Sequence, residues 1–209
     1  MTDHKKFPQL IAFDFHGVLT RQQSDTKAIQ TQLKIDKPPG KVNYYNLMVS
    51  KNADVNYMMP TLNEIVYFIR YIQEVSPNTR FGVVSVGENE AYIIDMLRYC
   101  FERAAVPLVS PFNKSNVVAN FVYARLDRDS KIKLRERGLS KSKILQINYI
   151  CEQEGIDPPG CETVLLDDNY MNIEQTVGVC GMLVDPIYFR INIWNKHSVL
   201  CNYSQILFK

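Results

Sequence analysis

Carboxylate and hydroxyl side chains follow three short apolar segments of the chain, each at the point where a segment ends. Asp14 follows the first segment, and Ser85 closes the second. Two adjacent acids, Asp167 and Asp168, follow the third. Carboxylates can attack an electrophilic centre and can share a hard cation such as Mg²⁺, while a hydroxyl donates a hydrogen bond to an anion. If the three segments lie side by side, these residues meet at one edge and form a polar site.

The three apolar segments have the character of buried parallel β-strands. Each is too short for a helix, is apolar on both faces, and ends at a polar residue or a glycine. The segments are residues 9–13, 81–86 and 163–166. A further strand is expected near Leu108 and Val109, and the last strand of the sheet is expected at residues 181–186.

Segments with helical periodicity lie between and after these strands. The apolar side chains of residues 61–75 fall along one face of a helix, and Pro60 and Pro77 flank that segment, as expected near helix ends. Residues 88–104 and 143–156 have a similar pattern. Strands that alternate with helices predict an α/β fold, in which a doubly wound, mainly parallel sheet carries helices on both faces. Ligands of such sheets bind beyond the carboxyl ends of the strands, where the acidic and hydroxyl residues stand.

The composition predicts one globular domain over residues 1–209 and argues against several classes of protein. Hydrophobic residues make up 46% of the chain and the net charge is +2, so no strong field directs it to nucleic acid or to a membrane. No apolar stretch approaches the ~20 residues of a transmembrane helix, and the N-terminus lacks the features of a signal peptide. The five cysteines are scattered without a Cys-x-x-Cys pair. This argues against a disulfide framework and a zinc site, and predicts a cytoplasmic protein in a reducing compartment.

Four segments carry the polar residues in a fixed order along the chain. The first is LIAFDFHGVLT, which contains Asp14 and His16, and the second is FGVVSVG with Ser85. The third, KILQINYICEQEGI, opens on Lys143, and the fourth, TVLLDDNYMNI, contains the acidic pair. This ordered set resembles the four motifs of the haloacid dehalogenase-like (HAD) phosphatases, whose first motif reads D-x-D-x-[TV]-[LV]. The resemblance covers about residues 9–185 and departs from the first motif at His16.

The resemblance implies a Mg²⁺-dependent phosphomonoesterase that works through an aspartyl-phosphate intermediate. Asp14 is the expected nucleophile, and Ser85 is expected to donate a hydrogen bond to a phosphoryl oxygen. Lys143 would neutralise charge on the phosphoryl group and orient the nucleophile. The order of the motifs also excludes a two-component receiver domain, in which the acidic pair precedes the phosphorylated aspartate.

The metal ligands that the resemblance implies come from both acidic positions. Asp14 and Asp168 are the expected direct carboxylate ligands of Mg²⁺, and Asp167 is expected to hold the ion through a water molecule. The family's second aspartate also supplies a ligand, through its backbone carbonyl. His16 replaces that aspartate here and keeps the carbonyl, so metal binding is compatible with the substitution.

His16 also bears on the substrate, because the family's aspartate at this position is the general acid and base. A histidine can fill that role with an ordinary pKa of ~6.5, although an inert histidine in the loop is the alternative. A phenol has a pKa of ~10, so a phenolate leaves with less proton donation than an alkoxide does. The substitution therefore favours phosphotyrosine over alkyl phosphates.

The length of the insertions predicts no large cap domain over the site. Residues 18–59 leave room for a flap or a minimal cap only, and an open site admits a side chain of another protein. The fourth motif, with an N-I pair after the two acids, is similar to that of capless magnesium-dependent protein-tyrosine phosphatases. A phosphorylated protein is therefore the expected substrate, and nucleic acid is not expected as a partner. The capless site without an export signal also resembles effector phosphatases that intracellular bacteria deliver into host cells.

Two other functions compete with a protein phosphatase. A phosphatase for nucleotides or nucleic-acid ends is compatible with the basic segment at 125–143. A non-catalytic module that binds phosphoproteins is the second alternative, because His16 departs from the catalytic motif. Turnover of phosphopeptides and small metabolites, with and without Mg²⁺, distinguishes the three.

Three assignments within the chain stay open, together with the oligomeric state. Lys141 precedes Lys143 by two residues and is the alternative lysine of the third motif. Residues 125–143 form either a solvated helical face or a docking surface. Residues 42–60, rich in Tyr and Met, either pack over the sheet or line a cleft for an aromatic substrate. The side chains that would line that cleft are Tyr44, Tyr45 and Tyr57.

Overall fold

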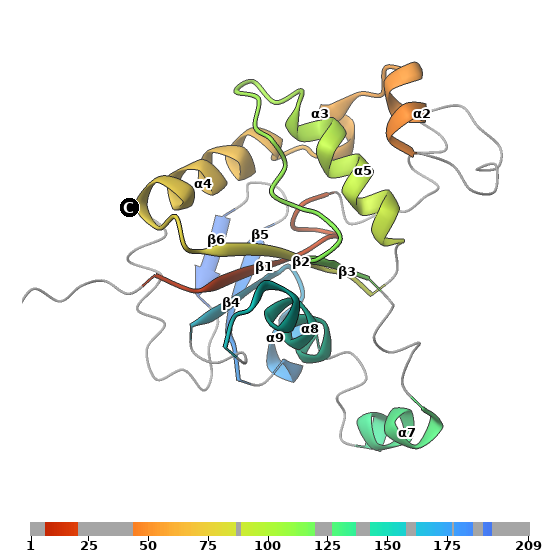
Figure 1. Cartoon of the computed structure of the whole chain (residues 1–209), viewed down its shortest axis with the longest axis vertical. Coiled ribbons are helices and arrows are strands. Elements are labelled where there is room, and N and C mark those ends of the chain that lie inside the picture. The colour runs from red at the N-terminus through yellow and green to blue at the C-terminus, as the bar shows by residue number, and fades with distance from the viewer. Residues whose placement is uncertain are drawn as a thin grey trace, which may run out of the picture.

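A mainly parallel β-sheet lies at the centre of the computed structural model (Figure 1). Within the described residues the sheet has six strands in the order β3-β2-β1-β4-β5-β6, and neighbours are parallel except for β6, which is antiparallel to β5. The strands are β1 (Leu10–Asp14), β2 (Arg80–Val84), β3 (Val117–Val118), β4 (Thr163–Asp167), β5 (Cys180–Asp185) and β6 (Arg190–Ile193). The structure describes residues 7–20, 44–86, 89–119, 127–136, 143–157, 162–176, 178–185 and 190–193.

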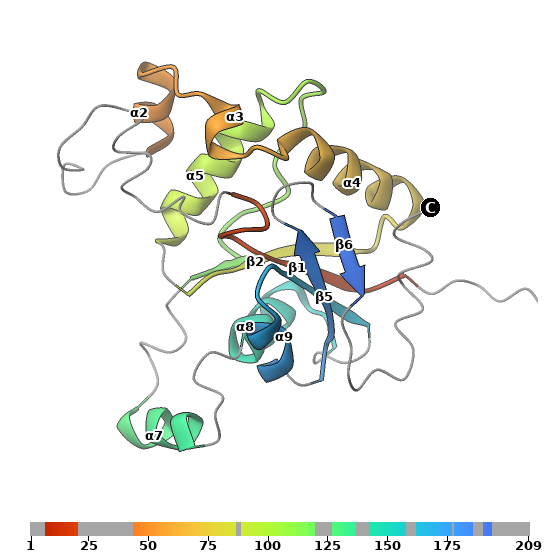
Figure 2. The same ribbon diagram turned by 180° about the vertical axis from the view of Figure 1, so that it is seen from behind.

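The chain winds outward from β1 in both directions. β2 and β3 extend the sheet on one side of β1, and the chain then returns to add β4 and β5 on the other side. The helices are α2 (Tyr44–Ser50), α3 (Val55–Met58), α4 (Leu62–Val75), α5 (Glu90–Phe101), α7 (Arg128–Glu136), α8 (Ile144–Glu154) and α9 (Tyr170–Gln175). α4 and α5 cover one face of the sheet, and α8 and α9 lie against the other (Figures 1 and 2). The predicted α/β fold, with a mainly parallel sheet between helices, is therefore confirmed.

β1 is buried from both sides, which explains its apolar sequence. Ile11 and Phe13 pack in the cluster that includes α4 and α5, whereas Leu10 and Ala12 pack with α8 on the opposite face. Side chains of a strand alternate between its two faces, so a strand covered on both sides is apolar throughout. The polar residue of this strand, Asp14, is its last one, at the carboxyl edge of the sheet.

The main predicted helices are confirmed, since α4, α5 and α8 lie within the segments that show helical periodicity. α8 ends at Gly155, whose φ of 63° is in the left-handed region that glycine adopts readily. The buried side of α4 consists of Leu62, Ile65, Val66, Ile69 and Ile72, the residues that share one face in the sequence pattern.

Two predictions about the sheet are wrong. No strand forms at Leu108 and Val109, where Val109 is 88% exposed; the third strand in sequence is β3, further along the chain. Pro107 and Pro111 flank this segment and lack the N–H that a ladder needs, which explains its irregular backbone. The strand at 181–186 is also not the last, because β6 follows it and pairs along its free edge.

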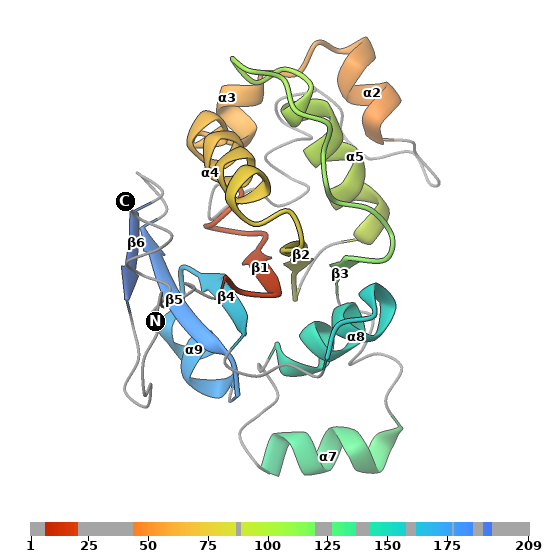
Figure 3. The same ribbon diagram turned by 60° about the vertical axis from the view of Figure 1, so that its left-hand side comes forward.

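α2 and α3 pack against α5, on the side of the molecule away from α8 (Figure 3). The hydroxyl of Tyr45 donates to the carboxylate of Glu102 at 2.7 Å, and the hydroxyl of Tyr99 donates to the carbonyl of Ala53 at 2.7 Å. Glu102 follows the last residue of α5, about 17 Å along the helix from its first turn. Tyr45 therefore lies at the far end of α5 from Ser85. Of the segment expected to form a flap, residues 21–43 lie outside the described residues.

α7 lies apart from the layers that cover the sheet in all three views (Figures 1–3). Its described side chains are mostly exposed, including those of Arg128, Ile132 and Lys133. This position agrees with the interpretation of the basic segment as a solvated helical face. The residues on either side of α7, 120–126 and 137–142, lie outside the described ranges.

The cysteines differ from the sequence-based expectation at one position. Cys100 and Cys151 are free and buried, whereas Cys180 is disulfide-bonded. The sequence argued against a disulfide framework, and the disulfide at Cys180 departs from that argument. The cytoplasmic location stays a prediction. Among the helices in the described ranges, none combines the length and the apolar character that crossing a membrane requires.

Candidate active site

Three neighbouring strands bring their carboxyl ends together at one edge of the sheet. Asp14 ends β1, Asp167 ends β4, and Ser85 directly follows β2. β1 lies between the other two strands, so the predicted convergence of these residues is confirmed. The winding direction reverses between β1 and β4, and ligands of doubly wound sheets bind at such a switch point.

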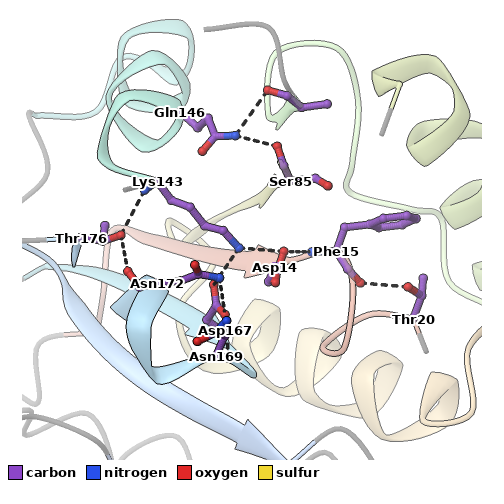
Figure 4. Close-up of polar contacts among 11 residues, drawn as sticks. Asp14, Phe15, Thr20, Ser85, Lys143, Gln146, Asp167, Asn169, Asn172 and Thr176 are labelled. Atoms are coloured by element: carbon purple, nitrogen blue, oxygen red, sulfur yellow. Dashed lines mark hydrogen bonds and ion pairs between the residues drawn. The ribbon is translucent and has the colours of Figure 1, made fainter. Parts of the chain in front are cut away.

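The side chain of Lys143 reaches this edge from the start of α8 and lies between two carboxylates (Figure 4). Its Nζ is 2.7 Å from Oδ1 of Asp14 and 2.7 Å from Oδ2 of Asp167, and the side chain is 1% exposed. Its main-chain N–H donates to Oγ1 of Thr176 at 3.1 Å, so the residue is held at both ends. Lys143 is therefore the lysine that meets the acidic residues, whereas Lys141 lies outside the described part of the chain.

Burial and mutual charge set the protonation of this cluster. Burial raises the pKa of the Asp14 carboxyl to about 6 against the opposing charge of Lys143, and the carboxylates of Asp167 and Asp168 add to the rise. Burial alone lowers the pKa of Lys143, but the charges of Asp14 and Asp167 outweigh it and hold the pKa above its ordinary value. At neutral pH the lysine is therefore charged, and Asp14 is ionised.

Asp167 is completely buried and its oxygens are occupied by protein donors (Figure 4). Oδ1 accepts the main-chain N–H of Asn169 at 2.9 Å and the side-chain amide of Asn172 at 3.1 Å. Oδ2 accepts Nζ of Lys143 at 2.7 Å, and the amide of Asn172 lies 3.3 Å away. These contacts make Asp167 an anchor for the lysine, a role that sequence analysis did not assign to it.

The loop after β1 carries His16 and lies against Asp168. Gly17 has a φ of 81°, and a Cβ at this position would collide with the carboxylate of Asp168. The loop is closed by hydrogen bonds from the N–H of Gly17 to the carbonyl of Thr20, at 2.9 Å, and from the N–H of Thr20 to the carbonyl of Phe15, at 3.0 Å. A glycine is thus required here both by the backbone conformation and by the close approach of Asp168.

Ser85 presents a buried hydroxyl that has no hydrogen-bond partner within the described residues. The residue is 0% exposed, and its main-chain N–H donates to the carbonyl of Val118 at 2.9 Å. An unpaired buried hydroxyl costs about 1–3 kcal/mol, which a ligand that accepts its hydrogen bond would recover. A phosphoryl oxygen is an acceptor of this kind.

The acidic residues fit a divalent cation. Carboxylate oxygens of Asp14, Asp167 and Asp168 lie within 4.8 Å of one another. The ammonium of Lys143 balances one of the three carboxylates, which leaves an excess of negative charge. Hard oxygen donors with this excess of negative charge suit Mg²⁺. Because the oxygens of Asp167 are engaged by protein donors, Asp14 and Asp168 are the carboxylates that could hold the ion directly.

Sequence analysis missed the polar side chains that hold the site together. Gln146 and Asn172 both contact site residues or the strand ends beside them, and neither was named as functional. Gln146 stands three residues after Lys143, and residues three apart share a helix face, so its position could have been recognised. Asn172 was noted only as part of the N-I pattern, and its contact with Asp167 depends on the turn between β4 and α9.

The chain was compared with protein-family models, with curated proteins and with solved structures, and nothing matches. The resemblance to HAD phosphatases therefore rests on the four motifs alone. The geometry at the strand ends provides an independent reason to treat their residues as one site.

Proposed function

We propose that the protein is a Mg²⁺-dependent phosphomonoesterase of the HAD type, and that its substrates are phosphotyrosyl proteins. The observation that carries the proposal is the buried ammonium of Lys143, 2.7 Å from both Asp14 and Asp167 at the switch point of the sheet. A charged lysine fixes the orientation of a carboxylate nucleophile and provides positive charge beside an incoming phosphate. The unpaired hydroxyl of Ser85 on the adjacent strand supports the same assignment.

The reaction would proceed in two displacements at phosphorus. A carboxylate oxygen of Asp14 forms a bond to phosphorus while the bond to the ester oxygen breaks, which leaves an aspartyl phosphate. Lys143 orients the carboxylate and Ser85 donates to a phosphoryl oxygen. Asp14 and Asp168 would hold Mg²⁺, which when bound would reduce the repulsion between the anionic nucleophile and the phosphate dianion. Water then attacks the intermediate and regenerates the carboxylate with release of inorganic phosphate.

His16 is the proposed proton carrier of both displacements. It would donate a proton to the departing oxygen, and then accept one from the water that attacks the intermediate. His16 directly precedes Gly17, whose backbone lies against the carboxylate of Asp168. A phenolate needs this proton less than an alkoxide does, so aryl esters are the favoured substrates.

The position of α2 and α3 is compatible with a protein substrate. The described part of the expected flap, α2 and α3, packs on α5, and Tyr45 contacts Glu102 beyond the end of α5 that is remote from Ser85. These elements therefore do not supply a lid from that position. A tyrosyl phosphate at the surface of another protein could therefore approach the strand ends past these two helices.

Matched phosphotyrosine and phosphoserine peptides test the proposed function. We expect kcat/KM for the phosphotyrosine peptide to be higher by about tenfold or more, because its leaving group needs less protonation. Hydrolysis of both peptides, and of an aryl phosphate, should stop in excess chelator and return with added Mg²⁺. Turnover that persists in chelator would exclude the HAD mechanism, and equal rates for both peptides would exclude the tyrosine preference alone. A protein that binds the peptides without hydrolysing them would be a phosphoprotein-binding module.

The affinity for Mg²⁺ should depend on pH, because a proton competes with the ion for Asp14. Its pKa of about 6 means that the ionised carboxylate predominates above that pH and is lost below it. Lowering the pH from about 7 to about 5 should therefore weaken the apparent affinity about tenfold. Calorimetric titration with Mg²⁺ in the absence of substrate measures this. An affinity that is unchanged over that range would show that Asp14 is not a ligand.

A further inference from the structure

Gln146 lies in the first turn of α8 and contacts the residues that follow two strands (Figure 4). Its side-chain amide nitrogen donates to the carbonyl of Ser85 at 2.6 Å, and the carbonyl of Ala119 lies 3.3 Å away. The residue is 7% exposed. Two carbonyl acceptors on the same side require the nitrogen, and not the oxygen, of the amide to face them, so the contacts fix the orientation of the group.

The first turn of α8 therefore touches four adjacent strands. Lys143 contacts the ends of β1 and β4, and Gln146 contacts the residues that directly follow β2 and β3. These strands are neighbours in the order β3-β2-β1-β4. The helix thus fixes the position of the Ser85 main chain relative to Asp14, because both are tied to the same turn.

The contact with Ser85 has a direct consequence for anion binding. The peptide that joins Ser85 to Val86 is trans and planar. The N–H of Val86 therefore points in the opposite direction to the carbonyl of Ser85, which accepts the hydrogen bond from Gln146. Neither this N–H nor the hydroxyl of Ser85 donates a hydrogen bond within the described residues. A shift of this peptide would move both donors together.

We infer that Gln146 is a positioning residue for the phosphoryl group, acting through the main chain of Ser85; this inference rests on the proposed function. The amide of Gln146 holds the carbonyl of Ser85, and the hydroxyl of Ser85 is thereby kept in place for a phosphoryl oxygen. Gln146 itself does not touch the substrate. Its loss affects phosphate binding and leaves the carboxylates that bind the cation where they are.

The test uses inorganic phosphate as the probe, measured as a competitive inhibitor of aryl phosphate hydrolysis. Gln146→Met keeps the length of the side chain and removes the donor, and it should weaken phosphate binding about tenfold. Gln146→Glu, which also lacks a donor, is the second variant in case the first does not fold. Gln146→His keeps a nitrogen donor at similar reach and should restore most of the affinity. Gln153→Met, the same change at an exposed position of α8, is the control and should behave as wild type.

Two further measurements separate positioning from a general loss of structure. The affinity for Mg²⁺, measured calorimetrically without substrate, should stay within about twofold of wild type in the Gln146 variants, since Asp14 and Asp168 do not contact this residue. In a Ser85→Ala background the hydroxyl is gone and only the N–H of Val86 remains, so Gln146→Met should weaken phosphate binding less than it does in the wild-type background. An additive effect in the double variant would overturn the inference.

Different experimental results would overturn the role of Gln146 and the proposed function. If wild type hydrolyses aryl phosphates and binds phosphate, but the donor-free variants bind phosphate as wild type does, the role of Gln146 is wrong and the phosphatase stands. Equal losses in Gln146→Met and Gln146→His would also overturn it, because the donor would then not matter. If wild type neither hydrolyses aryl phosphates nor binds phosphate in the presence of Mg²⁺, the proposed function falls, and the inference falls with it.

Discussion

Asp14→Asn is expected to abolish hydrolysis of aryl phosphates while the protein keeps its fold. The amide has almost the shape of the carboxylate but cannot attack phosphorus, so kcat should fall by about 10⁴-fold or more. Stability should change little, because Lys143 keeps its ion pair with Asp167 at 2.7 Å and the substituted group no longer carries a buried charge. Burial already disfavours the charged form of Asp14, as its raised pKa shows.

Two measurements check this result. Steady-state hydrolysis of an aryl phosphate gives the loss of activity, and a phosphoenzyme sensitive to hydroxylamine should be trapped from wild type but not from the variant. Asp157→Asn, at an exposed position after α8, is the matched control and should keep wild-type activity. Activity of Asp14→Asn within about tenfold of wild type would mean that another residue attacks phosphorus.

Lys143→Met is expected to produce the largest loss of stability of any single change in the site. The substitution removes the ammonium that lies 2.7 Å from two buried carboxylates and leaves both without a counter-charge. Removal of one partner from a buried ion pair costs about 3–5 kcal/mol. Catalysis should be lost as well, because Asp14 is no longer oriented. Lys133→Met, on the exposed face of α7, is the control and should change stability little.

The pH dependence of stability in Lys143→Met shows whether charge or packing causes the loss. In the variant Asp14 loses the charge of Lys143, which opposes the rise of its pKa, so burial should raise that pKa above its wild-type value of about 6. The protonated form of Asp14 is therefore compatible with the fold, and stability is lost as the pH rises through this raised pKa. The free energy of unfolding in urea should differ from wild type much less at about pH 5 than at about pH 8. A difference that is independent of pH would attribute the loss to packing and not to charge.

The sequence allowed the three strands that build the site to be predicted, together with the residues at their ends. β1, β2 and β4 are buried on both faces, so each is largely a continuous apolar run. Such runs can be recognised from the sequence alone. β3 has two residues, Val117 and Val118, and gave no such signal. The contact of Asp167 with Lys143 also could not be predicted, because adjacent residues differ in direction and only the fold shows which of the two acids meets the lysine.

Contacts made by long polar side chains were the least predictable part. Gln146 and Asn172 are ordinary residues of helices by composition, and what they bind depends on how α8 and α9 dock on the sheet. The buried side of α4 could be predicted, because its five buried residues repeat with the period of the helix itself. Local periodicity is visible in a sequence, whereas a hydrogen bond between distant segments is not.

The dependence of the site on the first turn of α8 has a consequence for biosynthesis. Asp14 and Ser85 emerge from the ribosome well before Lys143, and β1 can pair with β2 before either α8 or β4 exists. A chain at that stage holds the nucleophile without its lysine. Contacts between segments so far apart in sequence form late, because closing the intervening chain is entropically costly. If the protein is the proposed phosphatase, the nascent chain should therefore be inactive until its C-terminal half has docked on the sheet.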